Sequence, residues 1–148
     1  MSAYRTVVVG TDGSDSSLRA VERAGSIAGA DAKLIVASAY LPQHDDARAA
    51  DALKDESYKV SGSAPIYAIL REAKERALAA GATNVEERSV VGAPVDALVG
   101  LAEDVDADLL VVGNVGLSTI AGRLLGSVPA NVSRRARIDV LIVHTTGK

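Results

Sequence analysis

Short runs of apolar residues alternate along the chain with longer segments of mixed polarity. The runs are rich in Val, Leu, Ile and Ala, and they predict five β-strands, at residues 5–10, 33–39, 84–90, 109–113 and 140–144. The segments between them predict helices at residues 16–28, 65–80, 94–103 and 128–137. Because strand–helix alternation of this length builds βαβ units, we expect an α/β fold with an open, doubly wound, five-stranded parallel sheet and helices on both faces.

Glycine and proline mark the predicted helix ends. Gly29 and Gly81 follow the first two helices, where a C-cap is expected. Pro65 and Pro94 lie where the first turn of a helix accepts a residue without an N–H group. These positions support the predicted helix boundaries.

One connection is much longer than the others. Residues 40–63 are rich in Ala, Asp and Ser and include the acidic pair Asp45-Asp46. Because long connections in small domains are usually either mobile or functional, two interpretations stay open. The segment is either a surface excursion, partly helical, or a lid over a ligand.

Composition narrows the class of protein. The chain has 148 residues, which predicts one domain over residues 1–148, and its core must be aliphatic because there is no Phe or Trp and only four Tyr. The absence of Cys excludes disulfides and cysteine nucleophiles. No apolar stretch approaches the roughly 20 residues that span a bilayer, and none is typical of a signal peptide. We therefore expect a soluble cytoplasmic protein without a membrane partner, and its net charge of -3 argues against a nucleic-acid partner.

A group of glycines follows the fourth predicted strand. Gly113 and Gly116 are separated by two residues, and Gly126-Ser127 comes after nine more, at the start of the last predicted helix. Glycines allow close approach of the backbone to a ligand, and a helix start favours an anion such as phosphate. Taken singly these are turn glycines and a helix cap, but together they favour nucleotide binding.

A second polar segment follows the first predicted strand, Gly10-Thr11-Asp12-Gly13-Ser14. In open α/β sheets ligands bind beyond the carboxyl ends of the strands, where neighbouring connections run to opposite faces. If the first and fourth strands are neighbours, Asp12 and the Gly113 loop flank one crevice. Asp12 would then accept hydrogen bonds from a ribose or an adenine amino group; alternatively, it caps the first helix.

The combined pattern resembles the universal stress protein family. The resemblance rests on Val-Val-Val-Gly-Thr-Asp-Gly-Ser near the N-terminus and on Gly-x-x-Gly, nine residues and Gly-Ser near the other end, and it covers essentially the whole chain. It implies the strand order 3-2-1-4-5, an adenine nucleotide such as ATP at the ends of the first and fourth strands, and a homodimer made through the last strand.

The resemblance also implies which residues line the nucleotide. Gly10, Thr11 and Asp12 would lie along the adenosine, with the backbone near Ser38 and Ala39 against the base. The remaining positions lie at the end of the fourth strand or after it: Val112, Gly113 and Asn114 on the ribose side, and Gly116, Gly126, Ser127 and Val128 around the phosphate.

Two departures from the family pattern concern the phosphate. Leu117 and Ser118 follow Gly116, where ATP-binding members often have a basic residue, and Pro129 removes one amide from the last helix. Arg123 is the only cation in the loop 117–125. Because a triphosphate needs neutralisation, AMP, ADP or cyclic AMP is an alternative to ATP, although Mg²⁺ bound with ATP would compensate.

Catalytic residues are not expected. His44 and His144 have no matching serine or carboxylate, so we predict a stress or signalling module that binds nucleotide rather than a fast enzyme. Two other classes stay open. One is a weak ATPase or an ATP pyrophosphatase-type enzyme, since Asp12-Gly13-Ser14-Asp15-Ser16-Ser17 loosely matches the loop of that fold. The other is a dimeric scaffold without a ligand.

Overall fold

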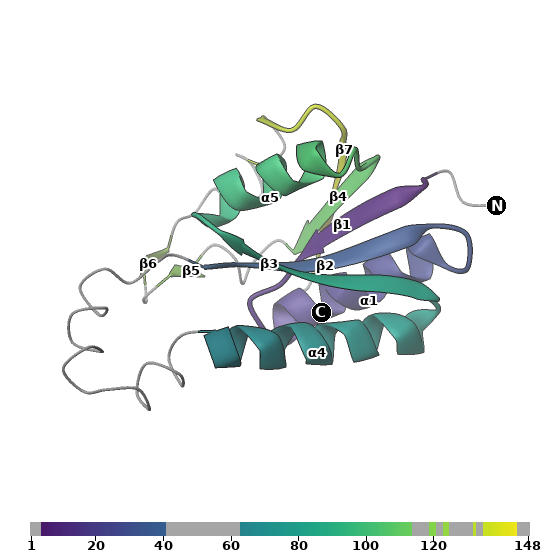
Figure 1. Cartoon of the computed structure of the whole chain (residues 1–148), viewed down its shortest axis with the longest axis horizontal. Coiled ribbons are helices and arrows are strands. Elements are labelled where there is room, and N and C mark those ends of the chain that lie inside the picture. Colours follow the sequence, from purple (N-terminus) through teal and green to yellow (C-terminus); the bar gives the residue numbers. More distant parts are fainter. Residues whose placement is uncertain are drawn as a thin grey trace.

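The computed structural model describes residues 4–40, 63–113, 119–120, 123–124, 132 and 135–144. The elements follow one another as β1 (Thr6–Gly10), α1 (Asp15–Ala28), β2 (Lys33–Tyr40), α4 (Ser63–Ala80), β3 (Asn84–Val91), α5 (Pro94–Asp104), β4 (Leu109–Gly113), β5 (Thr119–Ile120), β6 (Arg123–Leu124) and β7 (Asp139–Val143) (Figure 1). Nearly all of the long connection lies outside the described residues, as does most of the helix predicted at 128–137. Of the residues predicted for that helix, Val132 and Arg135 are described and helical, whereas Ala136 and Arg137 are described and are not helical, so the predicted end at residue 137 is too late.

Five strands form one parallel sheet, with β1 in its middle. Their order is β3-β2-β1-β4-β7, and Val8 of β1 lies opposite Ile35 on one side and Leu110 on the other. Counted among the five predicted strands this order is 3-2-1-4-5, so the predicted fold class and strand order are both confirmed. The chain therefore runs from β1 toward one edge of the sheet and from β4 toward the other.

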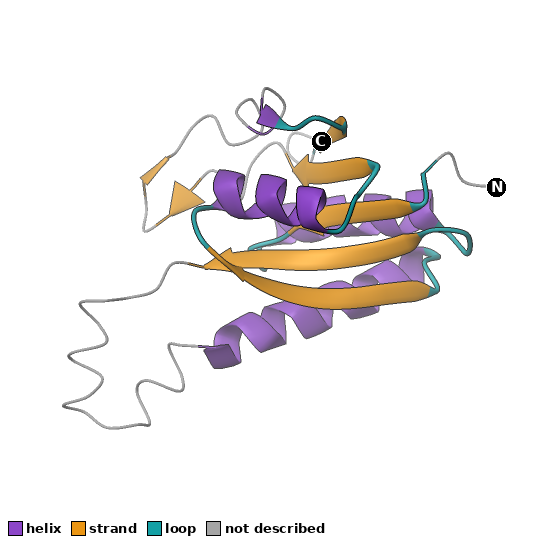
Figure 2. Cartoon of the chain, turned by 45° about the horizontal axis from the view of Figure 1, so that its top comes forward, coloured by secondary structure: helices purple, strands orange, loops and turns teal. Residues whose placement is uncertain are grey.

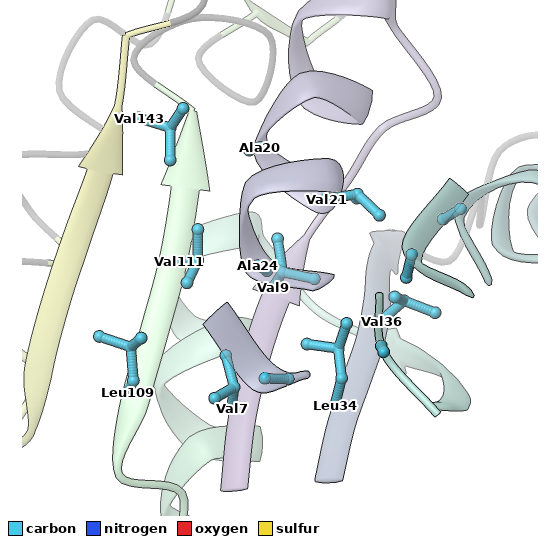
Figure 3. Close-up of a cluster of buried hydrophobic side chains, with 14 of the residues drawn as sticks. Val7, Val9, Ala20, Val21, Ala24, Leu34, Val36, Leu109, Val111 and Val143 are labelled. Carbon is cyan, nitrogen blue, oxygen red and sulfur yellow. The ribbon is translucent and has the colours of Figure 1, made fainter. Parts of the chain in front are cut away.

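Helices cover both faces of the sheet (Figure 2). Along β1 the side chains alternate: Val7 and Val9 pack with α1 and α4, whereas Val8 packs with α5. Figure 3 shows the first of these clusters, with Val21 and Ala24 of α1 close to the strands. Each fully buried valine or leucine contributes about 1.5–3 kcal/mol relative to an exposed one. The buried residues of the two described clusters are all aliphatic, and Tyr4 packs against the first cluster while only partly buried. Among the described residues no helix is long and apolar enough to cross a membrane.

Several predicted strand limits differ from the observed ones by one residue. β1 begins at Thr6, one residue later than predicted, and the carboxylate of Asp108 accepts hydrogen bonds there from the amides of Arg5 (2.8 Å) and Thr6 (3.0 Å). The last strand runs one residue earlier than predicted, because Asp139 pairs with Leu109 and β4 ends at Gly113. His144 therefore has no strand partner in β4.

A short antiparallel pair lies in the loop 117–125, where no strand was predicted. Thr119 of β5 pairs with Leu124 of β6, and Ile120 pairs with Arg123. Two residues, Ala121 and Gly122, connect these strands in the sequence, and a glycine is common in connections of that length. Strands of two residues are too short for an alternating pattern to predict them.

Candidate functional site

The chain after β1 and the described residue Val132 of the connection between β4 and β7 pack on opposite faces of the sheet. The chain after β1 enters α1, which packs on the face of Val7 and Val9. The chain between β4 and β7 includes Val132, which is buried with α5 on the face of Val8. Since β1 and β4 are neighbours, their carboxyl ends form the switch point at which open α/β sheets bind ligands (Figure 1).

The described candidate residues all lie at or near the carboxyl ends of β1, β2 and β4. Gly10 ends β1 and leads into Thr11 and Asp12, Ser38 and Ala39 belong to the last part of β2, and Val112 and Gly113 end β4. The predicted ribose and phosphate residues Asn114, Gly116, Gly126, Ser127 and Val128 lie outside the described residues. The structure thus brings together the adenosine half of the predicted site.

These residues differ in how far they are exposed to solvent. Asp12 is exposed and Ala39 is half-buried, whereas Gly10, Thr11, Ser38, Val112 and Gly113 are buried. Among the described candidate residues, Asp12 alone therefore exposes a carboxylate, and it lies beside buried backbone and small buried side chains.

The loop between β1 and α1 is held by its own hydrogen bonds. The amide of Thr11 donates to the carbonyl of Ala37 (2.9 Å), which ties the loop to β2. The hydroxyl oxygens of Thr11 and Ser17 lie 2.7 Å apart, and both residues are fully buried. Since the single Ser17 hydroxyl proton is donated to the Ser14 carbonyl (3.0 Å), Thr11 is the donor to Ser17. The Thr11 hydroxyl is thus used within the loop.

Asp12 does not cap α1, so that alternative is wrong. The cap is Ser14, whose hydroxyl oxygen accepts from the amide of Ser17 (3.1 Å). Oδ1 of Asp12 instead accepts from the amide of Ser14 (2.9 Å), before the helix begins. A carboxylate has acceptor sites on both oxygens, so Asp12 keeps capacity for a ligand's hydroxyl or amino groups.

The negative charges at the start of α1 affect where a phosphate would bind. Asp12 precedes this helix and Asp15 lies in its first turn, so two carboxylates occupy the end that would otherwise attract an anion. The start of α1 is therefore unfavourable for a phosphate. Polar ribose and base groups suit the β1 side.

Sequence reasoning missed two residues that shape this loop. Ser17 is buried at its centre, and Ile69 of α4 contacts Gly13, whose φ is +87°. The spacing Ser-x-x-Ser at positions 14 and 17 was the available signal for Ser17. No local pattern could have brought Ile69 to Gly13, because 55 residues separate them along the chain.

Comparison with known proteins gives the same architecture. The structure of a universal stress protein in complex with cAMP is 69% identical, with a TM-score of 0.75, and the match covers 98% of this chain and 100% of that one. The hypothetical protein MJ0577 has a TM-score of 0.73 at 22% identity over 98% of this chain and 99% of its own, which is a likeness of fold.

Sequence relatives give the family. Universal stress protein Rv1636 of Mycobacterium tuberculosis is 83% identical over 146 residues, 99% of this chain and 100% of the relative. A putative universal stress protein of Staphylococcus saprophyticus is 32% identical over 98% of this chain and 86% of its own length. The model of the universal stress protein family matches residues 3–144. The resemblance read from the sequence is confirmed, and the chain belongs to the universal stress protein family.

Proposed function

We propose that this protein binds an adenine nucleotide at the carboxyl ends of β1 and β4. The observation that carries the proposal is the cAMP complex of the relative that is 69% identical over 98% of this chain. The topology supports it independently, because an exposed carboxylate at Asp12 lies at the switch point between the two strands. Asp12 accepts hydrogen bonds from the ribose or base, and the chain after β4 holds the phosphate.

The protein acts as a binding module in stress or signalling rather than as a fast enzyme. In the loop after β1, the hydroxyls of Thr11 and Ser17 are buried and hydrogen-bonded to one another, so neither is available as a nucleophile. Asp12 is exposed and bonded to the Ser14 amide, with no histidine in its hydrogen bonds among the described residues. Catalysis would need a base held against a nucleophile, and these residues supply no such pair.

Cyclic AMP and AMP bind at least as well as ATP. Leu117 and Ser118 are uncharged, Pro129 lacks an amide hydrogen, and Arg123 is the only cation of the loop 117–125. Each hydrogen bond to a charged group contributes about 1.5–3 kcal/mol, and about 1.4 kcal/mol is a tenfold change in affinity. Losing one or two such contacts removes the usual advantage of a triphosphate, whereas a cyclic phosphate carries a single charge.

Competition calorimetry tests the proposal. The full chain is titrated with cyclic AMP, AMP, ADP and ATP at fixed salt, with and without Mg²⁺, and nucleotide released from freshly purified, denatured protein is identified by mass spectrometry. We expect intact adenine nucleotide and little effect of Mg²⁺. Formation of ADP or pyrophosphate would favour the enzymatic alternative, and no nucleotide with no binding would favour the scaffold. Displacement of cyclic AMP by far lower concentrations of ATP would contradict the charge argument.

A further inference from the structure

The Ser17 hydroxyl lies at the centre of the loop that carries Asp12. Its oxygen is 2.7 Å from Oγ1 of Thr11, accepts from the amide of Asp12 (3.3 Å) and donates to the carbonyl of Ser14 (3.0 Å). Ser17 is completely buried, so these are contacts to protein and not to a ligand. One side chain in the first turn of α1 therefore holds three residues of the preceding loop.

Asp12 is held at both its main chain and its side chain. Its amide donates to Ser17, and its carboxylate accepts from the amide of Ser14, whose carbonyl is also bonded to Ser17. The direction in which the exposed carboxylate points thus depends on the Ser17 hydroxyl. The same hydroxyl accepts from Thr11, whose own oxygen accepts from the amide of Gly13 (3.0 Å).

We propose that Ser17 is a positioning residue for the nucleotide: it contacts no ligand and sets the affinity by fixing the Asp12 carboxylate at the switch point between β1 and β4. This inference rests on the proposed function. Without the hydroxyl, the Asp12 amide and the Ser14 carbonyl lose their shared partner, and Thr11 loses its acceptor. The loop then has to be ordered by the nucleotide when it binds, and this ordering lowers the affinity.

Matched variants separate this role from a general loss of stability. Ser17→Ala removes the hydroxyl, whereas Ala24→Gly weakens the same helix at a buried position two turns farther along. Cyclic AMP is titrated into the wild-type chain, both single variants, Asp12→Ala and the double variant Asp12→Ala/Ser17→Ala, and thermal unfolding is recorded for each.

We expect Ser17→Ala to raise the dissociation constant for cyclic AMP by about tenfold, the scale of one lost hydrogen bond. Ala24→Gly lowers the unfolding temperature but changes the dissociation constant less than about twofold. In the Asp12→Ala background, Ser17→Ala has almost no further effect on affinity, because the carboxylate that it positions is gone. A purely structural serine would weaken both backgrounds equally.

Two results overturn the inference and are distinguishable. In the first, the wild-type chain binds cyclic AMP, and either Ser17→Ala binds it equally well or its loss of affinity is the same with and without the Asp12 carboxylate. Ser17 is then not a positioning residue, and the proposed function stands. If the wild-type chain binds no adenine nucleotide, both fail. Should Ser17→Ala not fold, Ser17→Cys replaces the hydroxyl by a group of similar size that is a much weaker donor and acceptor, and unchanged affinity in that variant overturns the inference equally.

Discussion

Gly13 lies against Ile69 so closely that a Cβ atom added to the glycine would stand 2.9 Å from Cγ1 of the isoleucine. Gly13 also has a φ of +87°, which side chains rarely adopt. The loop that carries Asp12 is therefore enclosed between the start of α1 and the first half of α4. Its conformation depends on contacts from both helices.

Gly13→Ala should destabilise the fold and weaken nucleotide binding. The positive φ costs an alanine roughly 1–2 kcal/mol, and the contact with Ile69 adds to this cost. Urea denaturation measures the first effect, and titration with cyclic AMP measures the second. Unchanged stability would mean that the loop adapts freely and that α4 does not constrain it.

Gly25→Ala should lower stability by a different route. A Cβ at Gly25 in α1 would stand 2.7 Å from the backbone carbonyl oxygen of Ala77 in α4, so the two helices would have to separate. We expect a loss of about 1–3 kcal/mol, the usual cost of forcing extra atoms into a packed core. Urea denaturation measures this loss.

Gly100 in α5 supplies the matched control, since nothing lies within 4 Å of an added Cβ there. Gly100→Ala should raise stability by about 1 kcal/mol through helix propensity alone. Equal effects of Gly25→Ala and Gly100→Ala would contradict the assigned close approach of α1 and α4.

The stability contributed by Glu86 should depend on pH. Hydrogen bonds from Lys33 and then Arg88 lower the pKa of the Glu86 carboxyl below its ordinary value. The folded pKa is thus below the unfolded one, so the contribution is present above the unfolded pKa and disappears as the pH falls through the folded pKa.

Glu86→Gln should therefore cost at most about 1 kcal/mol at pH 7, since the partly exposed pair is screened by solvent, and nothing at strongly acidic pH. Denaturation across the acid range measures the difference from wild type. Glu87→Gln is the control, because among the described residues Glu87 has no ion-pair partner. A cost for Glu86→Gln that does not change with pH would contradict the ion-pair explanation.

The sequence predicted the strands and their order well because the signals were local or carried by the family resemblance. Val7, Val8 and Val9 form an apolar run typical of a strand buried on both faces, and Gly29 ends α1 with a φ of +55°. The expected neighbours β1 and β4 then placed Asp12 beside the carboxyl end of β4. The local sequence pattern and the expected topology were therefore enough to predict the strands, their order and the position of Asp12.

What the sequence did not resolve depended on contacts between distant or competing groups. Asp12 and Ser14 are both good caps, and only the geometry assigns the cap to Ser14. The buried pair Thr11 and Ser17 has no hydrophobic signal, since serine and threonine are mostly exposed in proteins. The amide of Thr6 at the start of β1 donates to Asp108, a residue 102 positions away.

The phosphate half of the site leads to a further prediction. Gly126 opens the predicted last helix, outside the described residues, and the resemblance assigns it to the phosphate. Gly126→Val should abolish nucleotide binding and leave the fold intact, because a branched side chain would occupy the space of the ligand. Circular dichroism measures the fold and titration measures binding. Unchanged affinity would mean that this helix start is not the anion site.

The two edges of the sheet differ in how they are protected. The outer strand β3 carries Glu86, Glu87 and Arg88 in its middle, and charged side chains discourage pairing with another strand. The opposite edge strand, β7, has only aliphatic residues between Asp139 and His144, and Ile142 is 37% exposed. An apolar edge of this kind favours pairing with a second copy of the chain.

We therefore predict a symmetric homodimer built on β7. Sedimentation of the full chain should give a dimer at micromolar concentration, and Ile142→Lys should weaken it by roughly tenfold or more, about 1.4 kcal/mol, because an ammonium group would be buried without a partner. Val91→Lys is the matched control: Val91 is 54% exposed at the end of β3, so the same charge placed on the other edge should leave the dimer unchanged. A wild-type chain that sediments as a monomer at that concentration would contradict the prediction. A dimer that Val91→Lys disrupts and Ile142→Lys does not would place the interface at β3.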